Sequence, residues 1–234
     1  MSDAQRLALS LMGRMNEVAH VGAPLPSGLA PFGVGQSEVM MRLAALEART
    51  RHHVSTTIPT LMFDPEDVAH KLDRRSRDRG VAVETITLPR SLRFNPLLTS
   101  LNPTIRIGPA LVRCIIVDQQ LAVIAGPDTH DGATTAWLAT TGEFLEAAIT
   151  MWQAVLSESR PALPPGTEPP LDRRLIEVAR AVCLGRTDAA IARQLGTSER
   201  TIARHVASIL QVTEARSRAE AVLNMLGRGR QSRT

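Results

Sequence analysis

Tyrosine is absent from this chain of 234 residues, and phenylalanine and tryptophan together make up only 3% of it. Proteins that bind RNA or single-stranded DNA stack the bases on aromatic rings. The shortage of rings argues against a surface of that class, and equally against a ligand pocket lined by aromatic side chains. Lysine is scarce as well: Lys71 is the only one, so arginine carries almost all of the positive charge.

Cysteine is nearly absent, and the sequence contains no pattern of metal ligands. Cys114 and Cys183 each lie in an apolar run, which predicts buried free thiols in a reducing cytosol. No Cys-x-x-Cys pair occurs, and the neighbours His52 and His53 would point to opposite faces of a strand. A Walker-type phosphate loop is missing too. We therefore expect neither a metal nor a cofactor.

The sequence also lacks a long apolar run. Its first residues mix Asp3, Arg6, Arg14 and Glu17 with apolar positions, which excludes a signal peptide and a transmembrane segment there. We expect a cytoplasmic protein that makes no contact with a membrane. Apolar residues make up 44% of the chain, enough for a packed core, and the length allows one large domain or two modest ones.

Positive charge is concentrated in the last part of the chain. Residues 171–234 hold twelve arginines and six acidic residues, a net charge of +6. The preceding 170 residues hold fifteen basic and seventeen acidic residues, a net charge of −2, and the two values give the +4 of the whole chain. Such an asymmetry is typical of a nucleic-acid-binding module.

The strongest local pattern lies within residues 187–206. It predicts a short helix, a tight turn at Gly196 and a second helix that begins at Thr197 or Ser198. Apolar residues recur at helical spacing on one face of each helix: Ala189, Ile191, Ala192 and Leu195 on the first, and Ile202, Val206, Ile209 and Leu210 on the second. This arrangement is typical of a helix-turn-helix.

The other face of the second helix carries two arginines among small side chains: Arg200, Ala203, Arg204, Ala207 and Ser208. Guanidinium groups can bind guanine edges, and alanine can lie against thymine methyl groups. We expect residues 198–211 to enter the major groove of double-stranded DNA, with Arg200 and Arg204 reaching the bases. An ordinary helical hairpin with solvated arginines is the alternative that spacing alone leaves open.

A longer set of residues extends this pattern in both directions. It comprises Leu171, Arg174, Glu177, Val178, Gly185, Ile191, Ala192, Leu195, Ser198, Thr201, Ile202, His205, Ile209 and the run Arg216-Ser217-Arg218-Ala219. In this register residues 171–227 resemble the four-helix DNA-binding domain of LuxR-type transcription regulators, which NarL-type response regulators share. Two places depart from the family pattern: Leu175 replaces an acidic residue, and Val212-Thr213-Glu214 replaces the usual step before the last helix.

The resemblance implies roles for three further residues. Thr201 and His205 would hold the DNA backbone, and Ser198 would add a contact from the start of the helix. One such module makes few base contacts, so we expect a homodimer on a repeated half-site, with RNA polymerase as a candidate partner. An initiation factor of the sigma type is a competing class, but it would require an aromatic-rich helical bundle upstream.

Residues 1–51 are expected to form a helical arm. Helices are predicted over residues 3–21 and 37–51, and the Gly- and Pro-rich stretch 22–35 predicts a loop between them. The methionine and leucine stripes on these helices predict packing faces, either within the chain or against a second copy. We favour dimerisation through this arm.

Residues 52–159 alternate strands and helices, which predicts an α/β domain with a mixed sheet and flanking helices. Asp118-Gln119-Gln120 is expected to be a hairpin turn between two central strands, 112–117 and 121–125. Five prolines within residues 157–170 predict an extended linker, placed at 160–170, which leads to the all-α four-helix domain at 171–234.

The order of elements in the α/β domain resembles one half of a phospholipase D-type fold, as in TrmB-like sensor domains. The motif of that superfamily, His-x-Lys-x-x-x-x-Asp, would fall on Leu111, Arg113 and Asp118. Leucine has no lone pair with which to form a phosphoryl intermediate, so the resemblance implies an inactive site without catalytic residues. Asp118 is then expected to be only a turn former. The alternative is a phosphodiesterase or nuclease of this fold that the helix-turn-helix targets to DNA.

No pattern in the sequence identifies the signal that this domain receives. A phosphorylated receiver needs an acidic pocket and a late lysine, and a lactone pocket of the LuxR kind relies on tyrosine and tryptophan; neither set is present. We expect an unidentified small-molecule or protein effector, and we assign no residues to its binding. The sequence thus predicts a DNA-binding transcription regulator whose output is controlled by a sensor-like α/β domain.

Overall fold

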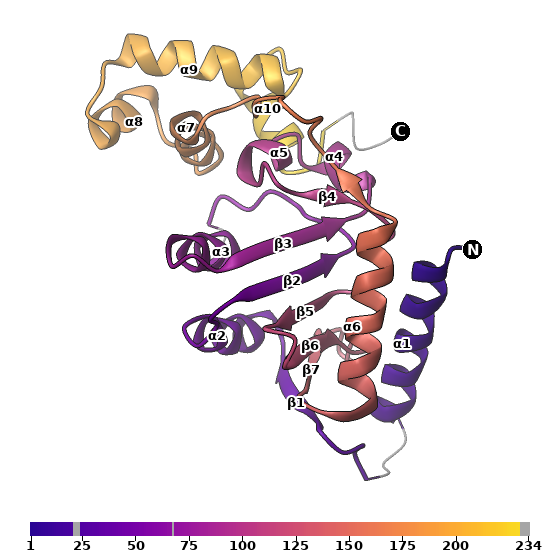
Figure 1. The fold of residues 1–234 in the computed structure, drawn as a ribbon. Coiled ribbons are helices and arrows are strands. Elements are labelled where there is room, and N and C mark those ends of the chain that lie inside the picture. The colour runs from indigo at the N-terminus through magenta and orange to yellow at the C-terminus, as the bar shows by residue number, and fades with distance from the viewer. Residues whose placement is uncertain (21–23, 67, 230–234) are drawn as a thin grey trace. The chain divides into compact units, whose positions relative to one another are not determined.

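The computed structural model describes residues 1–20, 24–66 and 68–229, which form two compact units (Figure 1). The first unit contains residues 1–59, 68–88 and 106–160, and the second contains residues 60–67, 89–105 and those from 161 onward. The chain therefore passes from one unit to the other five times. Two segments of the second unit, 60–67 and 89–105, come from the middle of the chain.

The first unit is built on a mixed sheet in the order β1-β7-β6-β5-β2-β3-β4-β8. The strands are β1 (Leu29–Val34), β2 (His53–Ile58), β3 (Ala82–Thr87), β4 (Arg106–Ile107), β5 (Cys114–Val117), β6 (Leu121–Ala125), β7 (Thr135–Ala139) and β8 (Arg160–Pro161). Strands β2, β3 and β4 run parallel, whereas the pairs from β1 through β7, β6 and β5 to β2 are antiparallel. The prediction of a mixed sheet with flanking helices is confirmed.

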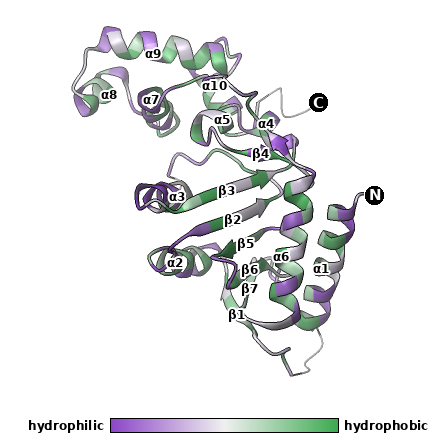
Figure 2. Ribbon diagram, in the orientation of Figure 1, coloured by the Kyte–Doolittle hydropathy of each residue, from purple (hydrophilic) through white to green (hydrophobic). Residues whose placement is uncertain are grey.

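Helices cover both faces of this sheet, because its central strands are apolar on both sides. Cys114 and Ile116 of β5 belong to the cluster formed with α1 (Asp3–His20) and α6 (Gly142–Ser157). Between them on the same strand, Ile115 belongs to the cluster under α2 (Gln36–Glu47). In Figure 2 strand β5 is hydrophobic, whereas α3 (Val68–Asp78), beside α2, is mainly hydrophilic.

Helix α1 packs its apolar stripe inside the first unit, along α6. The buried residues follow the same helical spacing on both partners: Ala4, Ala8, Leu11 and Met15 on α1, and Phe144, Ala148, Met151 and Val155 on α6. The Glu158 carboxylate accepts a hydrogen bond from the Ala4 N–H (3.0 Å), which joins the end of α6 to the first turn of α1. The stripe predicted from sequence thus packs within the chain, and dimerisation through residues 1–51 stays a prediction.

One strand lies where the sequence predicted a loop. The proposed loop at 22–35 contains β1, although residues 21–23 lie outside the described part. Pro31 and Gly33 are typical turn residues. Among the described strands, however, β1 pairs only with β7, and its register shifts between these two residues. An edge strand with a bulge tolerates a proline, which cannot donate a hydrogen bond, and a glycine. The loop prediction for residues 29–34 was therefore wrong.

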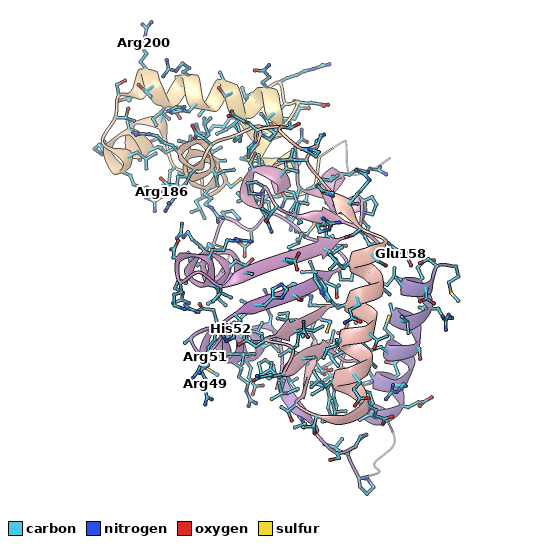
Figure 3. All side chains as sticks on the ribbon, in the orientation of Figure 1. Arg49, Arg51, His52, Glu158, Arg186 and Arg200 are labelled. Atoms are coloured by element: carbon cyan, nitrogen blue, oxygen red, sulfur yellow. The ribbon has the colours of Figure 1, made fainter. Side chains whose placement is uncertain are left out.

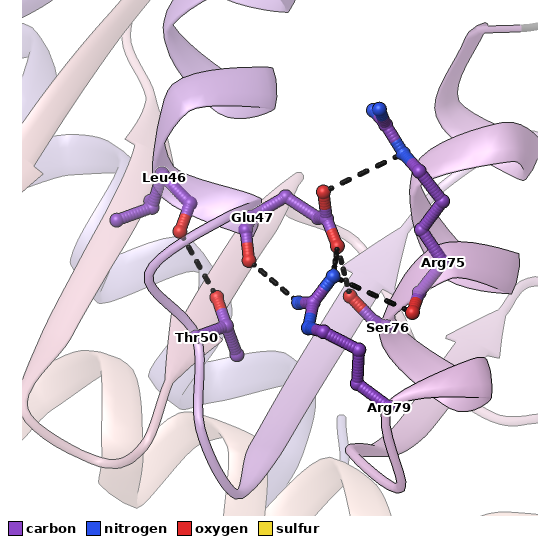
Figure 4. Close-up of polar contacts among 6 residues, drawn as sticks. All are labelled: Leu46, Glu47, Thr50, Arg75, Ser76 and Arg79. Atoms are coloured by element: carbon purple, nitrogen blue, oxygen red, sulfur yellow. Dashed lines mark hydrogen bonds and ion pairs between the residues drawn. The ribbon is translucent and has the colours of Figure 1, made fainter.

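Helices α2 and α3 are joined by polar contacts around Glu47 (Figure 4). Its carboxylate accepts hydrogen bonds from Arg79 Nη1 (2.5 Å) and Ser76 Oγ (3.1 Å), and it lies 3.6 Å from Arg75 Nε. Arg79 Nη2 also donates to the Glu47 carbonyl at the end of α2 (2.8 Å). The carboxylate and the carbonyl are satisfied together, so this part of the basic helix α3 is bound to the end of α2.

The second unit is helical. Its elements are α4 (Arg90–Phe94), α5 (Leu98–Leu101), α7 (Arg173–Cys183), α8 (Asp188–Leu195), α9 (Glu199–Val212) and α10 (Arg218–Met225). The last four are the four helices predicted for the C-terminal region. Within the described residues, no helix has the length and apolar character needed to cross a membrane.

Candidate nucleic-acid interface

Helix α8 has defined ends that set the position of the helix that follows it. Thr187 caps its start by accepting a hydrogen bond from the Ala190 N–H (3.3 Å). Gly196 ends it in the left-handed conformation, with φ 60° and ψ 42°. The Thr197 N–H then returns to the Ala192 carbonyl (3.0 Å), which closes the turn in the manner of a Schellman motif.

Helix α9 begins after Ser198, which settles the choice between Thr197 and Ser198. The Ser198 hydroxyl accepts a hydrogen bond from the Thr201 N–H (3.2 Å), and the two hydroxyl oxygens lie 2.9 Å apart. This cap satisfies one of the amide groups that the first turn leaves unpaired. The remaining amide groups of that turn can still donate to an anion.

The inner faces of α8 and α9 pack into one core. Ile191 and Ala192 of α8 and Ile202 and Ile209 of α9 are buried together, as their spacing predicted. Two arginines of the family pattern fasten the neighbouring helices to this pair. Arg174 of α7 donates to the Leu195 carbonyl at the end of α8 (3.1 Å), and Arg218 of α10 pairs with Asp188 (2.5 Å).

All seven candidate DNA-binding residues lie on α9 or at its cap. Ser198, Arg200, Ala203, Arg204 and Ala207 are exposed, whereas Thr201 and His205 are half-buried. In Figure 3 the Arg200 side chain projects away from the body of its unit, and Arg186 projects on another side. Among the described residues, none accepts a hydrogen bond or forms an ion pair with the guanidinium of Arg200 or Arg204.

The departure from the family pattern after α9 is accommodated by side-chain hydrogen bonds. Thr213 is buried, its hydroxyl donates to the Ile209 carbonyl (2.7 Å), and its carbonyl accepts from Asn224 Nδ2 of α10 (2.8 Å). Glu214 takes a positive φ of 51°, which lets the Ala215 N–H reach the Leu210 carbonyl (2.8 Å). A threonine and an asparagine thereby close the turn between α9 and α10. The hydrophobic periodicity of the sequence does not predict that this threonine and this asparagine would pair.

Neither cysteine is suited to nucleophilic chemistry. Both are free: Cys114 is buried, as predicted, and Cys183 is half-buried. Burial raises the pKa of Cys114 to about 12 and that of Cys183 to about 11. Both thiols are therefore protonated at neutral pH, the form that does not attack electrophiles. The described residues contain no group of three or more His, Cys, Asp or Glu side chains that could hold a metal ion.

The three residues matched to the phospholipase D motif have separate environments. Leu111 packs partly buried against the apolar core, and Arg113 is exposed. Asp118 opens the hairpin turn between β5 and β6, where it and Gln119 have φ values of 51° and 54°. Its carboxylate accepts hydrogen bonds from three consecutive backbone N–H groups, those of residues 51, 52 and 53, at 3.0, 2.8 and 2.8 Å. Asp118 thus forms the turn and also holds the entry to β2.

Comparison with known proteins places one part of the chain in a family. Residues 169–225 match the family described as bacterial regulatory proteins, luxR family. No curated protein matches the sequence of the chain.

Among solved structures, the chain is similar to Nuc, a phospholipase D family member from Salmonella typhimurium, with 14% identity over 58% of this chain and 99% of that one and a TM-score of 0.45. NucT from Helicobacter pylori gives 14% identity, 57% and 98% coverage and a TM-score of 0.46. TrmBL2, an archaeal chromatin protein, gives 9% identity, 68% and 62% coverage and a TM-score of 0.45. Likeness at this level says nothing of activity. Residues 169–225, which contain the capped helices α7 to α10, are a helix-turn-helix domain of the LuxR family.

Proposed function

We propose that this chain is a cytoplasmic transcription regulator that binds double-stranded DNA sequence-specifically, with α9 in the major groove. The observation that carries the proposal is the outer face of α9 in a LuxR-type domain: two exposed guanidinium groups stand among alanines, and no described residue engages them. Unengaged arginines break no hydrogen bond within the protein when they bind an acceptor, and the small side chains between them let the helix approach the base edges.

The spacing on α9 assigns each residue a role in this proposal. Arg200 and Arg204 are four residues apart, so they lie on one face with about 6 Å of rise between them and can reach bases at neighbouring steps. Ala203 and Ala207 repeat that spacing and would contact thymine methyl groups. Ser198, Thr201 and His205 flank this face and would hold the phosphate backbone.

Recognition of a repeated half-site would require two copies of the chain. The apolar stripe of α1 is buried against α6, whereas α10 carries an apolar outer face: Leu223 is 48% exposed, Ala219 is exposed, and Val222 and Leu226 are half-buried. We propose that a second copy packs on this face of α10. An effector of the first unit and a contact with RNA polymerase complete the proposed regulator.

The test is selection of bound fragments from a random duplex library with the full chain, at a stated salt concentration. Enrichment of a motif with two half-sites is the expected result. Binding without an enriched sequence, with a steep dependence on salt, would reduce α9 to a phosphate-binding surface. The same preparation is assayed for hydrolysis of phosphodiester bonds; turnover abolished by Asp118→Asn would favour the nuclease instead.

A further inference from the structure

The hydrophobic core of the helix-turn-helix unit contains side chains that do not belong to the LuxR-type domain. Phe63 is 4% exposed and Leu97 is fully buried, and both lie in the cluster formed by Ile176, Ile191 and Ile202. The family match begins at residue 169, so these two residues come from outside it. They belong to the two inserted segments, residues 60–67 and 89–105.

The segment 60–67 is held against α7 by Arg180. The Arg180 guanidinium lies over the Phe63 ring, 5.6 Å from its centroid. Its Nη1 donates to the carbonyl oxygens of Asp64 (3.2 Å) and Pro65 (3.0 Å). One side chain of α7 thus contacts the ring and two consecutive carbonyl groups, and all three contacts depend on the conformation of this segment.

The segment 89–105 is attached to the same unit at several points. Helix α5 packs against α7, as Figure 1 shows. The Ser100 hydroxyl accepts a hydrogen bond from the Leu171 N–H (3.0 Å), directly before α7, and the Ile105 carbonyl accepts one from the Ala162 N–H (2.9 Å). The two segments also bind each other, since the Leu61 N–H donates to Ser91 Oγ (3.1 Å).

Both segments begin at the carboxyl ends of neighbouring parallel strands. Segment 60–67 follows β2 and segment 89–105 follows β3, and the last paired residues of these strands are Ile58 and Thr87. The covalent continuation of each strand therefore enters the core beneath α7, through Phe63 in one segment and Leu97 in the other.

We propose that residues 60–67 and 89–105 are the coupling element through which the sheet of the first unit controls the DNA-binding helices, with Arg180 as the positioning residue that transmits the change to α7. The proposal rests on DNA binding by α9. Helix α7 packs directly on α9, so a change in segment 60–67 that moves Arg180 also alters the support of α9. Coupling of this kind is reciprocal: DNA on α9 must in turn stabilise segment 60–67.

The experiment is hydrogen exchange of the full chain, with and without a saturating duplex recovered from the selection. We expect DNA to slow exchange about five- to tenfold at the amides of 61–64 and 66, besides protecting α9. In Arg180→Gln, protection of α9 should remain while protection of 61–66 is lost. The matched control is Arg173→Gln, which removes the same charge from an exposed position of the same helix and should behave like the wild type.

A second pair of variants tests the coupling independently, in case Arg180→Gln does not fold. Phe63→Leu should accelerate exchange in α7 of the free protein, whereas Phe32→Leu, in the first unit and similarly buried, should not. Fluorescence of Trp137 and Trp152, which both lie in the first unit, reports whether that unit stays folded. Protection of α9 by DNA without protection of 61–66 in the wild type would overturn the coupling alone. Absence of α9 protection would overturn the DNA-binding proposal. In that case the free protein still tests the coupling: if α7 exchanges at the wild-type rate in both Arg180→Gln and Phe63→Leu, the coupling is overturned as well.

Discussion

The arginines of the second unit fall into two groups, those that donate hydrogen bonds within the protein and those that do not. Arg174, Arg180 and Arg218 donate to protein carbonyl or carboxylate oxygens and join helices to one another or to segment 60–67. Arg200 and Arg204 have no such acceptor among the described residues. A guanidinium that is bonded within the protein stabilises the fold, whereas those of Arg200 and Arg204 are free to stabilise a complex. Variants of the first three arginines should therefore change stability, and variants of Arg200 and Arg204 should change binding.

Arg204→Ala should therefore weaken DNA binding by about 1–3 kcal/mol and relax the choice of base at one position. The physical basis is the bidentate contact to one base pair that Arg204 makes in the proposed complex. Affinities are measured by titration against the selected duplex and its single-base variants. The matched control is Arg193→Ala, an exposed arginine on α8. A loss that is equal across all duplexes would show that Arg204 contacts phosphate and not a base.

A second prediction at the scale of the residue concerns Asp118, whose contribution to stability should depend on pH. Partial burial opposes ionisation of the Asp118 carboxyl, but hydrogen bonds from the N–H groups of residues 51–53 outweigh it and lower its pKa below the ordinary aspartate value. A carboxyl whose pKa is lower in the folded state stabilises the protein above its unfolded pKa, and that stabilisation is lost as the pH falls through the folded pKa.

We expect Asp118→Asn to lower the free energy of unfolding by about 1 kcal/mol at neutral pH, a figure that allows for screening by solvent. Asparagine also tolerates positive φ, so the turn itself is kept. Urea denaturation should show the difference between the two proteins shrinking as the pH falls below about 4. A difference that does not change with pH would assign the effect to the turn and not to the charge.

At the scale of the element, the turn between α8 and α9 depends on a left-handed residue. Gly196→Ala would place a side chain at φ 60°, at a cost of about 1–2 kcal/mol. No atom lies within 4 Å of the added Cβ, so the loss is purely conformational. The control is Gly13→Ala in α1, where the added Cβ also meets nothing and φ is not positive. Because alanine favours a helix interior, that change should stabilise by about 0.5–1 kcal/mol. Thermal unfolding of both variants checks the opposite signs.

Elements were predictable where local pattern and final environment agree. The 3-4 spacing of Ile202, Val206 and Ile209 identifies α9, and the apolar runs of β5 and β6 around Asp118 identify a central hairpin. The prediction failed at β1, because Pro31 and Gly33 are turn residues whose cost disappears on a bulged sheet edge. The sequence also gives no sign that Phe63 and Leu97 pack under α7, since they lie about 110 and 80 residues from Ile176 and only the folded chain brings them there.

At the scale of the whole molecule, the five passages of the chain between the units change what a fragment can report. The proline-rich stretch 160–170 is one connection among several. Its Ala162 N–H donates to the Ile105 carbonyl, and the N–H of Leu171, which directly follows the stretch, donates to the Ser100 hydroxyl. A fragment that begins in this stretch lacks Phe63 and Leu97 and exposes the core that they fill. Experiments on DNA binding therefore belong on the full chain, with point variants in place of truncations.

The assembly is tested at this scale with one exposed leucine. Leu223→Glu places a charge on the apolar face of α10, where the free protein tolerates it because the side chain is 48% exposed. If two copies meet at this face, burying an unpaired carboxylate there should dissociate them. Sedimentation should then give the mass of a single chain. Affinity for a duplex with two half-sites should fall about 10²-fold, as the second binding event ceases to be intramolecular, while affinity for a single half-site is unchanged.

Leu184→Glu is the matched control, because Leu184 is 47% exposed in the same unit but lies at the end of α7. It adds the same negative charge, so any general repulsion of DNA appears in both variants and only the loss of assembly is specific to Leu223. Equal affinities of the two variants for the two-half-site duplex would remove α10 from the interface. In α1 the stripe Ala4, Ala8, Leu11 and Met15 already packs within the chain, so a dimer through residues 1–51 would use another face of that arm. A dimer that survived Leu223→Glu would then have to form through another surface, and the spacing of the two selected half-sites would constrain its geometry, since the separation of the two recognition helices must match it.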